Sequence, residues 1–151
     1  MFIIFARRGV DIERYPAIKH HLAQYRERLE PRPSDHTGAW SGRKPGNYRW
    51  YEIQDTVEYW SLFEQPKIVY PIIAKEPRFA FDEEGYYTND KCFIIPRRDL
   101  YLLALLNSHL LFEITKMRVS VLGDEQAGGR LELRAVHLQH LPIRHIAFTT
   151  V

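Results

Sequence analysis

Histidines that lie near one another along a chain can bind zinc or take part in hydrolysis. Five of the seven histidines form two such groups: His20 with His21, and His137 with His140 and His145. Neither group has a cysteine or carboxylate at the spacing of a zinc site, so the pattern favours solvated or packed histidines. We therefore expect no metal site in this chain.

Carboxylates and thiols give no clearer catalytic pattern. The acidic run 82–84 could hold a cation, but the Gly85 that follows it is typical of a solvated hairpin turn. The single cysteine, Cys92, has no histidine near it in the sequence to activate it, and one cysteine fits a reducing cytoplasm. An unrecognised hydrolytic site stays open as an alternative, built around His137, His140 and Asp82.

Cofactor-binding loops need glycines in close succession after a strand, so that the backbone can approach a phosphate or S-adenosylmethionine. The eight glycines do not provide such a loop, since they stand at positions 9, 38, 42, 46, 85, 123, 128 and 129. The sequence also lacks the Gly-Lys-Ser/Thr phosphate loop and the Gly-x-Ser-x-Gly nucleophile motif. We therefore expect no catalytic residues and no cofactor in the chain itself.

Length and charge bound the remaining functions. The chain has 151 residues, of which 45% are hydrophobic, enough for the core of one domain. It shows neither a signal peptide nor an apolar run near the roughly 18 residues of a membrane span. Residues 1–50 hold ten Lys or Arg against five acidic residues, a net charge of +5, which permits nucleic-acid binding if these cations share a face.

Four elements are expected in the N-terminal third. The pattern predicts a strand over Phe2–Phe5, whose abrupt start suggests a segment cut from a longer chain, and an amphipathic helix over Pro16–Glu30. Pro31–Tyr48, rich in proline and glycine, is expected to form a long irregular loop, and Trp40 within it argues for function. A further strand is expected at Trp50–Ile53.

The rest of the chain predicts an α+β domain with a mixed or antiparallel sheet and packed helices. Strands are expected at Lys67–Ile73, Pro77–Phe81 and Tyr86–Ile95, the last two as a hairpin. Pro71 indicates that the first of these lies at a sheet edge or carries a bulge. The remaining expected elements are a short helix at Val57–Phe63, a buried helix at Asp99–Met117 capped by Asp99 with a possible break at Asn107 and Ser108, a loop at 123–129, a strand at Arg130–Arg134 and a short helix at Val136–Ile143.

Five blocks in this order closely resemble a known family. They read GVDIERYPAIKHHLAQYRERLEPRP, GRKPGNYRWYEIQD, FEQPKIVYPIIAKEPRFAFDEEGYYTNDKCFIIP, YLLALLNSHLLFEI and LRAVHLQHLPI. Together they resemble the Taq-type C-terminal specificity domain, the target-recognition domain of adenine-specific DNA methyltransferases and of fused type II restriction-modification enzymes. The resemblance covers about residues 2 to 145.

The resemblance implies a division of labour within a longer polypeptide. An N-terminal methyltransferase domain transfers a methyl group from S-adenosylmethionine to a flipped adenine, and the C-terminal domain grips and reads double-stranded DNA. This chain contains no Pro-Pro pair, so the catalytic Asn-Pro-Pro-Tyr type motif is missing. All 151 residues are therefore expected to form the recognition domain, with the catalytic domain and DNA as partners.

Cations on loops are the expected DNA contacts, because phosphates need positive charge and base edges need a few projecting side chains. The best cluster lies in the long loop and comprises Arg43, Lys44 and Arg49 with Trp40 and Tyr48. We expect Arg43, Lys44 and Arg49 to be surface positions whose replacement by alanine disturbs folding by no more than about 0.5 kcal/mol. A solvated basic loop over a packed tryptophan is the competing interpretation.

A second group surrounds the expected hairpin and comprises Lys75, Arg78 and Lys91. Lys67 is expected to mark an edge strand. Arg7 and Arg8 stand where a catalytic domain would join, so either a domain interface or phosphate contact is expected of them. Asn89 has the chemistry to bind adenine, but a turn role is favoured. A domain that serves only protein assembly is the remaining alternative.

Overall fold

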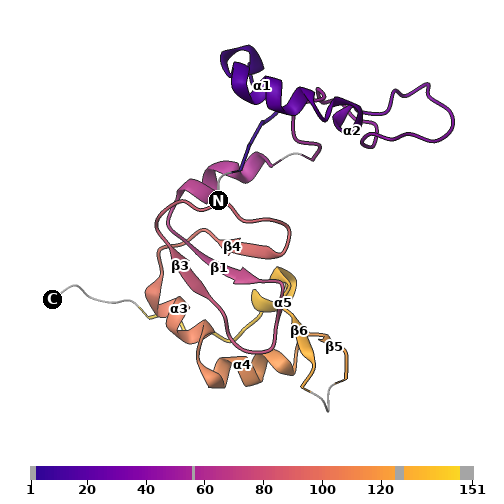
Figure 1. The fold of residues 1–151 in the computed structure, drawn as a ribbon. Helices are drawn as coiled ribbons and strands as arrows, with labels where there is room; N and C mark the ends of the chain where they lie inside the picture. The colour runs from indigo at the N-terminus through magenta and orange to yellow at the C-terminus, as the bar shows by residue number, and fades with distance from the viewer. Residues whose placement is uncertain (1–2, 56, 125–127, 147–151) are drawn as a thin grey trace. The chain divides into compact units, whose positions relative to one another are not determined.

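The computed structural model describes residues 3–55, 57–124 and 128–146. Contacts divide the chain into two compact units, Met1–Glu58 (unit 1) and Tyr59–Val151 (unit 2). The named elements of unit 1 are short helices, whereas unit 2 carries two three-stranded antiparallel sheets together with helices (Figure 1). The α+β class and the antiparallel sheet expected from the sequence are confirmed.

The helices of unit 1 are short. They are η1 (Ile12–Arg14, a 3₁₀ helix), α1 (Pro16–Ala23) and α2 (Arg26–Leu29). Pro16 occupies the first turn of α1, where its missing N–H costs nothing. The prediction of one helix over Pro16–Glu30 is wrong at Gln24 and Tyr25, which form a turn. Neither α1 nor α2 has a buried residue, so core packing does not hold them as one helix.

Two predicted strands of unit 1 do not form. Residues 3–5 have no ladder partner in the described part of the chain, and Phe2 lies outside it. The strand predicted at Trp50–Ile53 is a turn, in which the Glu52 N–H donates to the carbonyl of Arg49 over 2.9 Å. The Glu52 carboxylate also accepts the Arg49 N–H over 2.8 Å, and these two bonds close the backbone on itself.

Unit 2 includes all but the first residue of η2 (Glu58–Glu64), which confirms the short helix expected before Pro66. Its first sheet has the order β3-β1-β4, in which β1 is Lys67–Pro71, β3 is Ala80–Asp82 and β4 is Cys92–Ile95. Both β3 and β4 pair with β1 and not with each other. The predicted hairpin between them is therefore wrong, because β1 lies between the two strands.

Pro71 lies in the central strand, so the prediction of an edge strand is wrong as well. The ladder to β3 covers only Lys67–Val69, and Pro71 pairs on its other side with Cys92. The proline is tolerated because it stands beyond the end of the β3 ladder. The chain leaves the sheet at Ile72 and enters β2 (Ile73–Ala74) of the second sheet.

Lys67 is buried at the start of the central strand, contrary to the expected edge marker. Its side chain is 0% exposed, and its ammonium group donates to the carboxylate of Asp82 and, over 2.5 Å, to the carbonyl of Phe63. Asp82, expected in a solvated turn, also accepts from the N–H groups of Glu84 and Tyr86. Burial raises the pKa of Asp82, but these hydrogen bonds and the nearby ammonium outweigh it and leave the pKa below its ordinary value.

The second sheet has the order β2-β6-β5, with β5 at Val121–Leu122 and β6 at Arg130–Glu132. The expected long helix is broken at Asn107 and Ser108, as the sequence indicated, into α3 (Leu100–Leu106) and α4 (His109–Lys116). Asp99 caps α3 and Ser108 caps α4, each by accepting a backbone N–H. A last helix, α5 (Ala135–Leu138), confirms the short helix predicted there.

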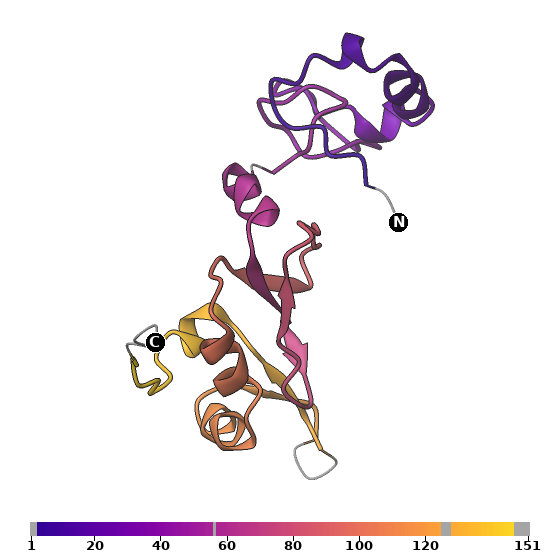
Figure 2. The same cartoon turned by 90° about the vertical axis from the view of Figure 1, so that its left-hand side faces the viewer.

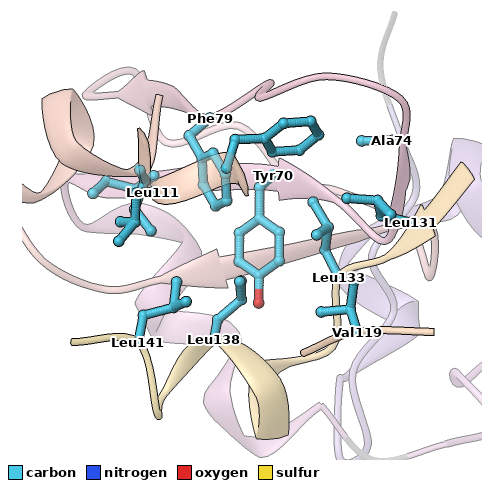
Figure 3. Packing of buried hydrophobic residues seen from close by; sticks show 12 residues of the cluster. Tyr70, Ala74, Phe79, Leu111, Val119, Leu131, Leu133, Leu138 and Leu141 are labelled. Carbon is cyan, nitrogen blue, oxygen red and sulfur yellow. The ribbon is translucent and has the colours of Figure 1, made fainter. Parts of the chain in front are cut away.

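The core of unit 2 lies between the strands and the helices (Figure 2). Tyr70, at its centre, is 2% exposed and packs against Phe79 with ring centroids 5.0 Å apart (Figure 3). Leucines from α4, β6, α5 and the residues just after β6 and α5 surround it: Leu111, Leu131, Leu133, Leu138 and Leu141. The expected burial is confirmed for one face of α4, whereas α3 is buried only in part, since Leu106 is buried and Leu100 is exposed. Among the described residues, no helix combines the length and the apolar character needed to cross a membrane.

Candidate nucleic-acid interface

The long loop of unit 1 is held in one conformation by backbone contacts. Pro31 and Arg43 form a parallel bridge, in which the Arg43 N–H donates to Glu30 and the Arg32 N–H donates to Arg43. Gly42 makes this approach possible, because a Cβ at this position would stand 2.3 Å from the carbonyl oxygen of Glu30. The segment is irregular, as expected, but it is fixed to the end of α2.

The guanidinium of Arg43 is directed into unit 1. It donates to the carbonyl of Leu29 over 2.7 Å, and to the carbonyls of Arg49, Trp50 and Glu52 over 3.3, 2.8 and 2.7 Å. It also lies over the Tyr48 ring, 4.6 Å from the centroid. The expectation that Arg43 projects from the surface is therefore wrong, and these contacts lead us to expect that its loss disturbs the folding of unit 1.

Glu52 and Tyr48 complete the structure beneath the loop. Glu52 is 5% exposed, and its carboxylate accepts the N–H of Gly9 over 2.7 Å as well as that of Arg49. Tyr48 is also buried, and its hydroxyl donates to the carbonyl of Lys44. Neither role was predicted from the sequence: Glu52 accepts from Gly9, 43 positions away, and Tyr48, predicted as a DNA contact, is buried.

Lys44 and Arg49 project from this structure. The Lys44 side chain is 57% exposed and pairs with the exposed Asp55 over 2.6 Å, an interaction that solvent weakens. Arg49 is exposed and donates to the hydroxyl of Tyr51, which raises the pKa of the guanidinium. Both side chains are accessible to solvent, as phosphate contact requires.

Trp40 is half-buried at the edge of the same loop. Its indole N–H donates to the carbonyl of Glu30 over 3.2 Å, and its ring meets the His36 ring edge-on. Trp40 is therefore packed in part, as the competing interpretation expects, and in part exposed. We call the group of Trp40, Lys44 and Arg49 the basic loop surface.

Arg7 and Arg8 are exposed in unit 1. Arg8 donates to the carbonyl of Gln54 over 3.0 Å and lies 5.8 Å from the Tyr48 ring. The guanidinium of Arg8 thus joins the start of unit 1 to the segment that follows the basic loop surface.

The second predicted group lies in unit 2. Arg78 pairs with Glu76 and Lys91 pairs with Asp90, each over 2.6 Å, and all four side chains are exposed. Lys75 is exposed and has no ion pair within the described residues. Asn89 accepts the N–H of Lys91, which is the turn role favoured from the sequence.

Unit 1 has four further arginines that were not predicted from the sequence to contact DNA. Arg14, Arg28 and Arg32 are exposed, and within the residues described their side chains have neither an ion pair nor a hydrogen bond. Arg26, beside Arg28 on α2, instead lies 5.1 Å from the ring of Trp50 and pairs with Glu30.

The described residues do not bring together three His, Cys, Asp or Glu side chains in a metal-binding group. Asp82 is engaged by Lys67 and two backbone N–H groups, so it cannot act as the partner of His137 or His140 in the alternative hydrolytic site. The arrangement on the surface of unit 1 suits the binding of a polyanion.

Two known proteins with similar sequences are type II methyltransferases. The chain is 29% identical over 99 residues to the type II methyltransferase M.BanIII of Aneurinibacillus aneurinilyticus, which covers 62% of this chain and 15% of the relative. It is 26% identical over 141 residues to the type II methyltransferase M.PaeR7I of Pseudomonas aeruginosa, which covers 92% of this chain and 23% of the relative. The chain thus spans less than a quarter of the length of either relative.

The family comparison covers both units. The model of the TaqI-like C-terminal specificity domain matches residues 7–143, from the first arginine pair to the end of α5 and beyond. This match includes the basic loop surface, Arg43 and Glu52, and the two sheets of unit 2. The chain belongs to the family of TaqI-like C-terminal specificity domains.

Proposed function

We propose that this chain recognises a specific sequence in double-stranded DNA and positions it for a separate methyltransferase domain. The observation that carries the proposal is the family match over residues 7–143 of a chain that displays cations on a fixed loop. Phosphates would take the cations, and base edges would be read by side chains that reach into a groove.

Within this proposal the residues of the basic loop surface have separate tasks. Lys44 exchanges its exposed partner Asp55 for a phosphate, at little cost because the existing pair is solvated. Arg49 presents a planar guanidinium, which suits either a phosphate or the O6 and N7 atoms of guanine. Arg14, Arg28, Arg32 and Lys75 supply further phosphate contacts, and Arg7, Arg8, Arg78 and Lys91 remain secondary candidates.

The chemistry itself belongs to another part of the polypeptide. The two relatives are methyltransferases several times longer than this chain, and the sequence contains no Asn-Pro-Pro-Tyr type motif. We propose that the complete gene product methylates adenine from S-adenosylmethionine, in the cytoplasm, and that this chain contributes binding but no catalytic group. Flipping an adenine out of the duplex costs a few kcal/mol, and a firm grip on the flanking DNA offsets this cost.

Salt-dependent DNA binding tests the proposal. The complete gene product is titrated with a duplex that carries its methylated sequence and with a scrambled duplex, at several salt concentrations. Replacing Lys44 and Arg49 together by alanine should weaken binding and make the salt slope shallower by about two units, roughly 0.9 for each lost phosphate contact.

The two duplexes separate reading from gripping. If Arg49 reads a guanine edge, its loss costs about 1 to 3 kcal/mol on the cognate duplex and little on the scrambled one. If it contacts a phosphate, both duplexes lose affinity alike. Unaltered affinity of the double variant on both duplexes would remove the basic loop surface from the interface.

A further inference from the structure

Arg43 connects two segments that are separate in the sequence. One of its hydrogen bonds reaches Leu29 at the end of α2, and the others reach the turn formed by residues 49–52. The Tyr48 ring lies against the same guanidinium, 4.6 Å from it. A single cation therefore holds both ends of the loop together.

The backbone of each cation on the basic loop surface is held by this arrangement. The carbonyl of Lys44 accepts the hydroxyl of Tyr48, whose ring is covered by Arg43. Arg49 is held at both backbone groups, since its carbonyl accepts from Arg43 and its N–H donates to Glu52. The side chains of Lys44 and Arg49 nevertheless stay exposed.

On the basis of the proposed function, we propose that Arg43 is a positioning residue for DNA recognition, which sets Lys44 and Arg49 in their binding arrangement before DNA arrives. Arg43 acts through these two residues and does not touch the duplex. A loop that is already ordered loses less conformational entropy on binding, so its contacts yield more affinity. Lysine cannot replace Arg43, because one ammonium group cannot reach carbonyls in both segments as the guanidinium fork does.

The contrast between arginine and lysine makes the role testable. A direct phosphate contact depends mainly on charge, and Arg43→Lys keeps the charge. A positioning role depends on the planar fork, and Arg43→Lys loses it. The substitution is therefore made in the wild type and in the Lys44→Ala/Arg49→Ala variant, with Arg134→Lys in unit 2 as a matched control at an exposed arginine, which pairs with Glu132.

DNA affinity of the complete gene product is measured against salt for each variant. Arg43→Lys in the wild type should reduce the affinity and make the salt slope shallower by up to about two units, as the loss of Lys44 and Arg49 does. In the Lys44→Ala/Arg49→Ala variant the same substitution should have no further effect. Arg134→Lys should bind like the wild type.

Two results would overturn the proposal in different ways. Wild-type affinity and slope for Arg43→Lys, with a slope shallower by about one unit for Arg43→Ala, would make Arg43 a direct phosphate ligand. Wild-type binding by the Lys44→Ala/Arg49→Ala variant would refute the proposed contacts themselves, and with them the proposed interface.

Tyr48→Phe keeps the proposal testable if Arg43→Lys does not fold. This change removes only the hydroxyl that holds the Lys44 carbonyl and keeps the ring beneath Arg43. It should lower DNA affinity in the wild type and have no effect in a Lys44→Ala background. An equal loss of affinity in both backgrounds would show that the structure beneath the loop does not act through Lys44.

Discussion

Breaking the buried pair of Lys67 and Asp82 should lower the stability of unit 2 strongly. Lys67→Met removes the ammonium group from a fully buried position and leaves the Asp82 carboxylate, which is 8% exposed, without its counter-charge. Breaking a buried ion pair by removal of one partner costs about 3–5 kcal/mol. For a domain of the size of unit 2, this corresponds to a loss of about 12 °C or more in melting temperature.

Urea denaturation and thermal melting measure this loss, and two further variants identify its cause. Lys91→Met removes a lysine from the exposed pair with Asp90, where both side chains are 77% exposed, and should leave stability within error. Adding Asp82→Asn to Lys67→Met should restore part of the lost stability, since no unpaired charge then remains buried. A loss below about 1 kcal/mol for Lys67→Met would refute the reasoning, because it would mean that solvent reaches the pair.

Three other predictions concern pH, packing and the loop. Because the folded-state pKa of Asp82 is lowered, its ionisation stabilises the fold above the unfolded pKa of about 3.9, and this contribution is lost as the pH falls through the folded pKa. Urea titrations at several pH values should show that Asp82→Asn lacks this acid-dependent loss of stability. A pH profile identical to that of the wild type would contradict the prediction. Gly42→Ala places a Cβ 2.3 Å from the carbonyl oxygen of Glu30 and should destabilise unit 1 by about 1–3 kcal/mol in denaturation, whereas unchanged stability would show that the loop does not pack on α2 as described. Arg43→Ala should lower the unfolding free energy by about 2 kcal/mol or more, because four carbonyls lose a donor. Lys44→Ala should change the unfolding free energy by less than about 0.5 kcal/mol, and equal effects of the two variants would contradict the separate roles of these residues.

Local signals in the sequence predicted local structure well. Asp99 as a helix cap, the break at Asn107 and Ser108, and the short helix before Pro66 all follow from interactions within a few residues, and all are confirmed. The apolar residues of α3 and α4 predicted that these helices pack against the core, but not that Leu100 and Leu110 stay exposed.

Long-range partners decided the elements that sequence reasoning missed. Lys67 is buried because Asp82, fifteen residues later, meets it across the β1–β3 ladder, and no local pattern marks such a pair. The segment Trp50–Ile53 has the residue types of a strand, but it forms a turn in which the Glu52 carboxylate accepts from Gly9, 43 residues earlier, as well as from Arg49. Arg43 was predicted at the surface because its own loop is polar, whereas its partners lie on α2 and in that turn.

The basic loop surface was also predicted in part from local signals, while its long-range contacts were not predicted. The sequence identified Lys44 and Arg49 by charge and by their place in a long loop, and both are exposed. It could not separate them from Arg43, because exposure and hydrogen bonding depend on the tertiary contacts of the loop. The roles of these residues toward DNA remain a proposal that binding measurements decide.

Exchange of residues 7–143 with a methyltransferase relative tests directly whether this chain selects the DNA sequence that is methylated. In the complete gene product, residues 7–143 are replaced by the matching segment of the Pseudomonas aeruginosa relative, and the methylated sequences in host DNA are mapped for both proteins and for the hybrid. If residues 7–143 read the DNA sequence, the hybrid methylates the sequence of the relative that donated the segment. A hybrid that remains active on the original sequence would show that another part of the polypeptide reads the DNA, and it would contradict the account.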